Sequence, residues 1–199
     1  KLKQSGEFTA EGFAKALALY YAALYHEDDE NWKASSSNDN VFNQSLNTYL
    51  MGETNTEVFF DKWRENHFTQ RDVDSLAAWG FNSIRIPMHY NLFTLPIQEE
   101  PVAGENTWIE TGFELIDDVL AWAAPHDIYV ILDMHATPGG QGTASAEIND
   151  YNPLYPSLWE SQENRDKLVA LWTRIADRYK DNEWIGGYDL INETHYDLP

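Results

Sequence analysis

Apolar residues recur along this chain at two different spacings, which predict helices and strands. A spacing of three and four residues marks one face of a helix. It predicts helices over residues 9–26, 56–66, 69–79, 111–124 and 161–179. Short β-rich apolar runs predict strands at 81–87, 128–134 and 185–193. The run at 128–134 is almost continuously apolar, as expected of a strand that is buried on both faces, and 185–193 is interpreted as another buried strand.

Local signals mark the ends of several of these helices. Thr69 and Asp72 form a T-x-x-D pattern, a weaker relative of the capping box. Ser161 is placed to cap the last predicted helix. The stretch 27–40, between the first two helices, is acidic and polar, so it predicts a loop or linker.

The order strand, helix, strand, helix, strand over the second half of the chain predicts an α/β fold with a parallel sheet and right-handed crossovers. The pattern fits both a doubly wound sheet and a (β/α)8 barrel. In both architectures, ligands bind at the carboxyl ends of the strands. The residues at those ends are therefore the first candidates for a site.

Each predicted strand ends in polar side chains. They are Arg85, His89 and Tyr90 for the first strand, Asp133 and His135 for the second, and Asn192 and Glu193 for the third. Because the carboxyl ends of parallel strands meet at one edge of a sheet, this pattern predicts a single site there.

Each of these residues also has a purely structural interpretation. Arg85 could form a buried ion pair with Asp133, and His135 could be a hydrogen-bonded core histidine. Asp133-x-His135 could bind a metal, but two ligands without a third make a weak site. Glu193 could cap a helix or pair with a surface cation. The occurrence of such residues at three successive strand ends favours a functional site over all of these.

Composition excludes several classes of function. The net charge of −20 argues against nucleic acid and against an anionic membrane surface as partners. The chain has no cysteine, so disulfides and thiolate chemistry are excluded. The GGQG run at 139–142 lacks the lysine and the following helix of a phosphate loop. No G-x-S-x-G elbow supports a serine hydrolase.

Three segments carry a resemblance to a known family. They are WGFNSIRIP at 79–87, YVILDMHATPGGQG at 129–142 and GGYDLINE at 186–193. In this order and spacing they resemble the second, third and fourth strands of glycoside hydrolase family 5, the cellulase-like endoglucanases. The resemblance covers residues 56–193 and implies a TIM (β/α)8 barrel and a retaining mechanism.

The resemblance also implies roles for the strand-end residues. Glu193 would be the acid/base that protonates the leaving oxygen and then activates water. Asn192 would hydrogen-bond the sugar 2-hydroxyl, an interaction that strengthens as the oxocarbenium-like transition state forms. Arg85 and His135 would organise the nucleophile and the lower face of the sugar. A glycosidic oxygen leaves poorly unless it is protonated, which agrees with a carboxylic acid at this position.

Further residues are candidates for substrate binding. His89 and Tyr90 follow the first strand, and Tyr90 and Trp159 could stack on sugar faces. For Trp159, an equally good interpretation is a residue that anchors its loop.

The chain departs from the family pattern in two places. The Gly-Val-Asn-like first strand is not found, and residues 41–52 are a poor substitute for it. We therefore assign 1–40 to a helical and acidic segment of unclear role, and 41–199 to the N-terminal part of the barrel. The family's nucleophile is a second Glu at the end of the seventh strand. We expect it to be absent from this chain, which would then hold about half of a barrel and would not complete the reaction alone.

The resulting hypothesis is retaining hydrolysis of a β-1,4-glucan within a complete barrel. β-Mannanase, xyloglucanase and exo-β-1,3-glucanase activities are alternatives within the class. A carbohydrate-binding or structural domain without catalysis is the alternative outside it. The expected partner is a poly- or oligosaccharide, with no cofactor or metal. We expect the protein to act in the extracellular or periplasmic space, because polysaccharides are large.

Overall fold

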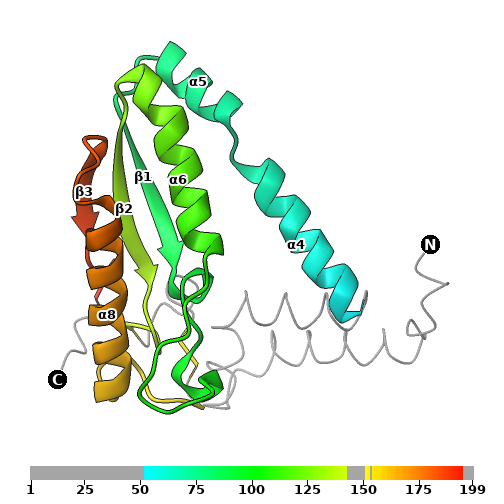
Figure 1. The fold of residues 1–199 in the computed structure, drawn as a ribbon, viewed down its shortest axis with the longest axis vertical. Coiled ribbons are helices and arrows are strands. Elements are labelled where there is room, and N and C mark those ends of the chain that lie inside the picture. The colour runs from blue at the N-terminus through cyan, green and yellow to red at the C-terminus, as the bar shows by residue number, and fades with distance from the viewer. Residues whose placement is uncertain (1–51, 143–150, 153, 195–199) are drawn as a thin grey trace, which may run out of the picture. The chain divides into compact units, whose positions relative to one another are not determined.

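The computed structural model describes residues 52–142, 151–152 and 154–194, which are coloured in Figure 1. The helix expected over 9–26 and the loop expected over 27–40 lie outside these described residues. Two compact units divide the chain between Phe68 and Thr69. Each unit is described by itself.

The described part of the first unit is one helix, α4 (Glu53–His67). It confirms the helix expected over 56–66 and extends it at both ends. Trp63 and His67 are one helical turn apart and stack with their ring centroids 4.1 Å apart. Val58, Phe59 and Trp63 are exposed.

The second unit begins with α5 (Gln70–Ala78), which confirms the helix expected over 69–79. The Thr69 backbone N–H and hydroxyl both donate to Asp72 Oδ2 at 2.8 Å. The hydroxyl hydrogen bond is the largest cause that lowers the pKa of Asp72. The predicted T-x-x-D signal therefore marks the beginning of a helix. The Asp72 side chain accepts hydrogen bonds from Thr69, the residue that precedes the helix.

Three parallel strands form the sheet of this unit, in the order β1 (Ser83–His89), β2 (Tyr129–Ala136) and β3 (Ile185–Asp189). Helix α6 (Thr111–Ala123) lies between β1 and β2 in the sequence, and α8 (Gln162–Tyr179) lies between β2 and β3. Figure 1 shows both helices on the same face of the sheet. The parallel sheet predicted from the alternating elements is confirmed. Within the described residues, no helix is long and apolar enough to cross a membrane.

The core lies between the sheet and these two helices. Alternate residues of β2 supply its sheet side, because successive side chains of a strand point to opposite faces. The buried residues are Val130, Leu132, Met134 and Ala136 on β2, Phe113, Ile116, Leu120 and Ala123 on α6, and Leu168, Leu171 and Ile175 on α8.

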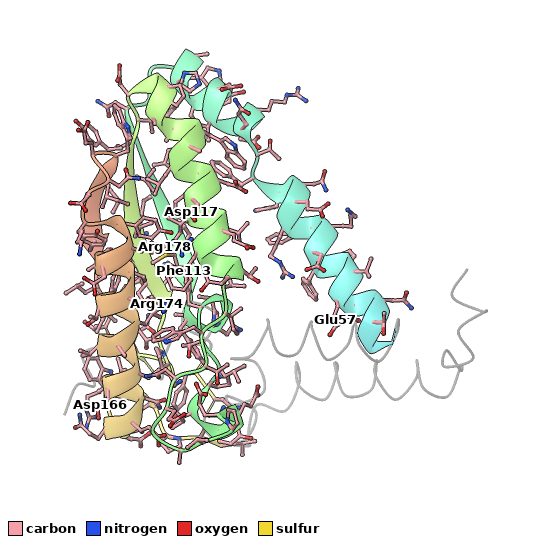
Figure 2. The ribbon with its side chains drawn as sticks, viewed as in Figure 1. Glu57, Phe113, Asp117, Asp166, Arg174 and Arg178 are labelled. Atoms are coloured by element: carbon pink, nitrogen blue, oxygen red, sulfur yellow. The ribbon has the colours of Figure 1, made fainter. Side chains whose placement is uncertain are left out.

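Polar contacts join α6 to α8 along the edge of this core (Figure 2). The Tyr179 hydroxyl oxygen lies 3.1 Å from the carbonyl oxygen of Phe113 and 2.9 Å from Asp117 Oδ1, and these two acceptors share its single proton. Burial is the main cause that raises the pKa of Tyr179. Arg178 pairs with Asp117, and the Arg174 guanidinium lies 5.3 Å from the centroid of the Phe113 ring. The two crossover helices are thus fixed to each other as well as to the sheet.

The strand predicted over 185–193 is shorter than expected. β3 ends at Asp189, and the chain then bends across the end of β2, where the Asn192 N–H donates to the carbonyl of Met134 at 3.1 Å. Glu193 has a left-handed backbone with φ 39°. The apolar run therefore predicts the strand correctly but not its end, because a contact with β2 takes the last residues out of the ladder.

Candidate active site

Arg85 is the centre of a polar network at the carboxyl end of the sheet. Its Nη2 lies 3.0 Å from Asp133 Oδ2 and 3.1 Å from Asp189 Oδ2. The same nitrogen donates to Asn192 Oδ1 at 2.7 Å. One guanidinium thus connects β1 with β2, β3 and the segment that follows β3.

Asp133 is fully buried, and its Oδ2 is shared between Arg85 and His135. His135 Nδ1 lies 2.8 Å from this oxygen. A carboxylate can only accept hydrogen bonds, so the proton of a neutral His135 ring sits on Nδ1. Nε2 is then the acceptor side of the ring. Asp133 therefore fixes both the orientation and the tautomer of His135.

Asn192 and Glu193 lie next to this network. The Asn192 side chain is buried, and its Oδ1 accepts from Arg85. Its Nδ2 has no hydrogen-bond partner among the described residues. Glu193 follows directly and is exposed. A buried amide with an unpaired N–H group and an exposed carboxyl group are therefore adjacent at the end of the sheet.

Gln141 ties the backbone around the site together. Its side chain is fully buried. Its Nε2 donates to the carbonyl of His135 at 2.7 Å and to the carbonyl of Asn192 at 2.8 Å. Its Oε1 accepts from the Thr137 N–H and from the Thr137 hydroxyl, both at 3.1 Å. The GGQG run, which is not a phosphate loop, thus has a structural role.

Of the three residues predicted to bind substrate, His89 is the last residue of β1, Tyr90 begins the short 3-10 helix that follows it, and Trp159 lies between β2 and α8. His89 and Tyr90 stack at a centroid distance of 5.1 Å where β1 ends. His89 Nδ1 accepts from the Asn91 N–H at 3.2 Å. Trp159 is half-buried, and its indole N–H donates to the carbonyl of Gln141 at 2.8 Å. This hydrogen bond favours the interpretation of Trp159 as the anchor of its loop.

The structure brings together Arg85 and His135 through Asp133, and Asn192 joins them through Arg85, with Glu193 attached by one peptide bond. Sequence reasoning did not select Asp189 or Gln141 as site residues. A signal for Asp189 was available, because it alternates with the apolar residues of the third predicted strand. No group of three side chains that could hold a metal ion occurs within the described ranges.

Comparisons with known proteins find a matching family model and several similar proteins. A family model described as "Cellulase (glycosyl hydrolase family 5)" matches residues 31–198. A beta-xylosidase of Phanerodontia chrysosporium is 35% identical over 144 residues, which are 72% of this chain and 29% of the relative. Endoglucanase C of Acetivibrio thermocellus is 26% identical over 138 residues, which are 69% of this chain and 36% of the relative. The chain thus spans about a third of the length of these relatives.

A crystal structure of rutinosidase from Aspergillus niger is similar in fold. It superimposes with a TM-score of 0.58 at 14% identity, over 76% of this chain and 40% of the other. At this identity the similarity concerns the fold alone.

Proposed function

Because this chain belongs to the cellulase family, glycosyl hydrolase family 5, we propose that it is part of an enzyme that hydrolyses β-glycosidic bonds, with Glu193 as the acid/base. The family resemblance that the three strand motifs carry is thereby confirmed. Family and structural similarity together imply a TIM-barrel-like fold, of which the described residues form three parallel strands with two helices on one face.

The observation that carries this proposal is the position of Glu193. Its carboxyl group is exposed at the carboxyl end of the sheet, directly after the buried Asn192. An acid that protonates a leaving oxygen must reach the substrate, whereas the side chains that orient it need not be exposed. Among the carboxyl groups of the site, that of Glu193 is exposed and does not pair with Arg85, whereas those of Asp133 and Asp189 do.

The other two carboxylates of the site are less suited to proton transfer. Asp133 and Asp189 both pair with Arg85 at about 3 Å, so the Oδ2 atom of each is occupied by the guanidinium. A retaining mechanism also needs a second carboxyl group, about 5 Å from the first, as nucleophile. We assign that role to neither aspartate, because each is occupied by the guanidinium.

Asn192 supports the same assignment. Arg85 holds its Oδ1, which turns the amide so that Nδ2 is the remaining donor. A sugar hydroxyl beside the scissile bond would be a suitable acceptor. We therefore propose that Asn192 donates to the 2-hydroxyl, and that Arg85 and His135 position the reacting sugar.

For the substrate we propose a β-linked glucan, with β-1,4-glucan first. The names of the relatives include an endoglucanase, a beta-xylosidase and a glucan endo-1,6-beta-glucosidase, so the linkage has to be measured. Polysaccharides of this kind are too large to cross a membrane unaided, and we accordingly propose action outside the cytoplasm.

The test is hydrolysis of aryl β-cellobioside, aryl β-glucoside and aryl β-xyloside by the full-length protein and its Glu193→Gln variant. We expect the variant to lose about 10²- to 10⁴-fold in kcat/KM on a substrate with a poor leaving group. Glu183→Gln is the matched control, because it removes the same charge from an exposed position before β3. We expect it to retain full activity.

Two outcomes would overturn the proposal. Glu193→Gln activity equal to that of the control would exclude Glu193 as the acid/base. Binding of a soluble glucan without turnover by the unmodified protein would instead indicate a carbohydrate-binding domain.

A further inference from the structure

Gln141 uses every hydrogen-bonding position of its side chain. A glutamine amide has two N–H donors and an oxygen with two lone pairs. The donors go to the carbonyls of His135 and Asn192, and the oxygen takes the amide and hydroxyl of Thr137. The side chain is fully buried, so no water competes for these groups. A fully satisfied buried polar network fixes one arrangement of the groups that it joins.

The bond to Asn192 is the one that affects the site. The carbonyl of Asn192 belongs to the peptide group that links Asn192 to Glu193. Gln141 Nε2 holds the oxygen of this group at 2.8 Å, while the N–H of Asn192 is held by the carbonyl of Met134 at 3.1 Å. Residue 192 is therefore fixed on both sides, and the direction in which the chain enters Glu193 is set by Gln141.

Glu193 needs such a support because of its backbone. Its φ of 39° lies in the left-handed region, which is unfavourable for a residue with a Cβ atom. A conformation of this kind persists only where the surroundings impose it. The fixed peptide group before Glu193 is a direct source of that constraint.

Gln141 itself has a rigid support. Its carbonyl accepts from the Trp159 indole N–H at 2.8 Å, and the carbonyl of Gly140 accepts from the Leu158 N–H at 3.0 Å. A Cβ atom on Gly139 would lie 2.7 Å from the carbonyl oxygen of Pro156, so the two loop segments are in close contact. Gln141 is thus held in place by backbone that packs closely against the segment at 156–159.

We propose that Gln141 is a positioning residue for Glu193, which aims the Glu193 carboxyl group at the leaving oxygen through the Asn192–Glu193 peptide group. This inference rests on the proposed function and deepens it. Gln141 does not touch the substrate. Its loss would therefore impair proton donation by Glu193 without removing the acid itself.

Leaving-group dependence distinguishes this role from a general loss of structure. A poor leaving group needs protonation, whereas an activated one such as 2,4-dinitrophenolate departs without it. Misplacement of Glu193 would slow the cleavage of the phenyl glycoside more than that of the dinitrophenyl glycoside. A reduced fraction of folded enzyme would slow both by the same factor.

The experiment measures kcat/KM of the full-length protein on phenyl and 2,4-dinitrophenyl β-glycosides of the preferred sugar. Gln141→Met keeps the volume of the side chain and removes all four hydrogen bonds. We expect the ratio of the two rates to change at least tenfold in favour of the dinitrophenyl substrate. Thr137→Val is the matched control, because it removes one hydrogen bond from the same oxygen and leaves the bond to Asn192 in place. We expect it to keep the ratio of the unmodified protein.

Gln141→Glu keeps the shape of the side chain and adds a second readout, the pH dependence of the rate ratio. Its carboxylate cannot donate to the two carbonyls, but the protonated form regains one donor. At each pH, the ratio of its two rates is compared with that of the unmodified protein. We expect the difference between the two proteins to shrink as the pH falls.

The outcomes separate the two proposals. If Glu193→Gln changes the ratio and both Gln141 variants do not, Gln141 has no positioning role and the proposed function stands. If Glu193→Gln also leaves the ratio unchanged, the acid/base assignment is wrong, and the role of Gln141 is overturned with it.

Discussion

The buried ion pair between Lys167 and Glu100 allows a sharp test of what holds the β1–α6 loop. Lys167 lies on α8 and its side chain is 2% exposed, while Glu100 lies in the loop and its side chain is 0% exposed. The Lys167 ammonium donates to Glu100 and to the Thr94 hydroxyl. The Thr107 N–H lies 3.0 Å from each oxygen of the Glu100 carboxylate. We expect Lys167→Met to leave this carboxylate buried without a counter-charge.

The magnitude follows from what remains around Glu100. Removal of one partner from a buried pair costs about 3–5 kcal/mol. The hydrogen bonds from Thr107 survive the substitution, so we expect the low end, about 3 kcal/mol, or about a hundredfold in the folding equilibrium constant. Glu100→Gln should cost a similar amount, because it strands the ammonium. The double variant should cost clearly less than the sum of the two, because no unpaired charge remains.

The pH dependence of stability tests the same pair. Burial raises the pKa of Glu100, but the hydrogen bonds from Lys167 and Thr107 outweigh it, so the pKa lies below its usual value. The unfolded chain therefore binds this proton more readily than the folded one. The contribution of Glu100 is fully present above the unfolded pKa and is lost as the pH falls through the folded pKa. In Lys167→Met, burial remains without its main compensation, and we expect acidification to stabilise that variant relative to the unmodified protein.

The assay is urea unfolding of the full-length protein, its two single variants and the double variant, over a pH series. Lys180→Met is the control, because this lysine is exposed and lies 3.7 Å from Asp177 at the end of α8. We expect it to cost less than about 1 kcal/mol, as exposed pairs do. The reasoning is refuted if Lys167→Met costs no more than this control, or if the effects of the two single substitutions simply add.

Two further predictions concern packing and capping. Gly112→Ala would place a Cβ atom 2.5 Å from the ring of Phe93, which is buried and packs edge-on against Phe113, so we expect a loss of about 1–3 kcal/mol in thermal unfolding. An unchanged Tm would show that the ring can move aside. Ser161→Ala removes the hydroxyl that accepts from the Asn164 N–H at 3.2 Å, and we expect a loss of about 1 kcal/mol that Ser161→Asp restores. Equal losses in both variants would exclude a capping role.

Elements with strong local signals were predicted well. For the helix expected over 161–179, the capping residue Ser161 and the residues of the apolar face all lie within one short segment of the chain. α8 ends at Tyr179 as expected. The helix expected over 111–124 matches α6 to within one residue. These elements need only information from neighbouring residues. The end of β3 does not, because it depends on the hydrogen bond between Asn192 and Met134.

The site was predictable in part for the same reason. Polar residues at strand ends are visible in the sequence, and Arg85, His135 and Asn192 join one network as the parallel sheet requires. The roles of Asp189 and Gln141 depend on partners 104 and 51 residues away. Amide and carboxylate side chains occur throughout the chain, and only the folded geometry selects these two.

Because side chains alternate along β2, neighbouring positions of this strand serve two different purposes, core packing and the polar network of the site. Leu132 and Met134 pack against the helices, while Asp133 and His135 point to the opposite face and take part in the polar network. One strand therefore serves the core with one set of side chains and the site with the other. The separation is incomplete at Asp133, because this buried carboxylate pairs with Arg85, and its loss would cost stability as well as the order of the site.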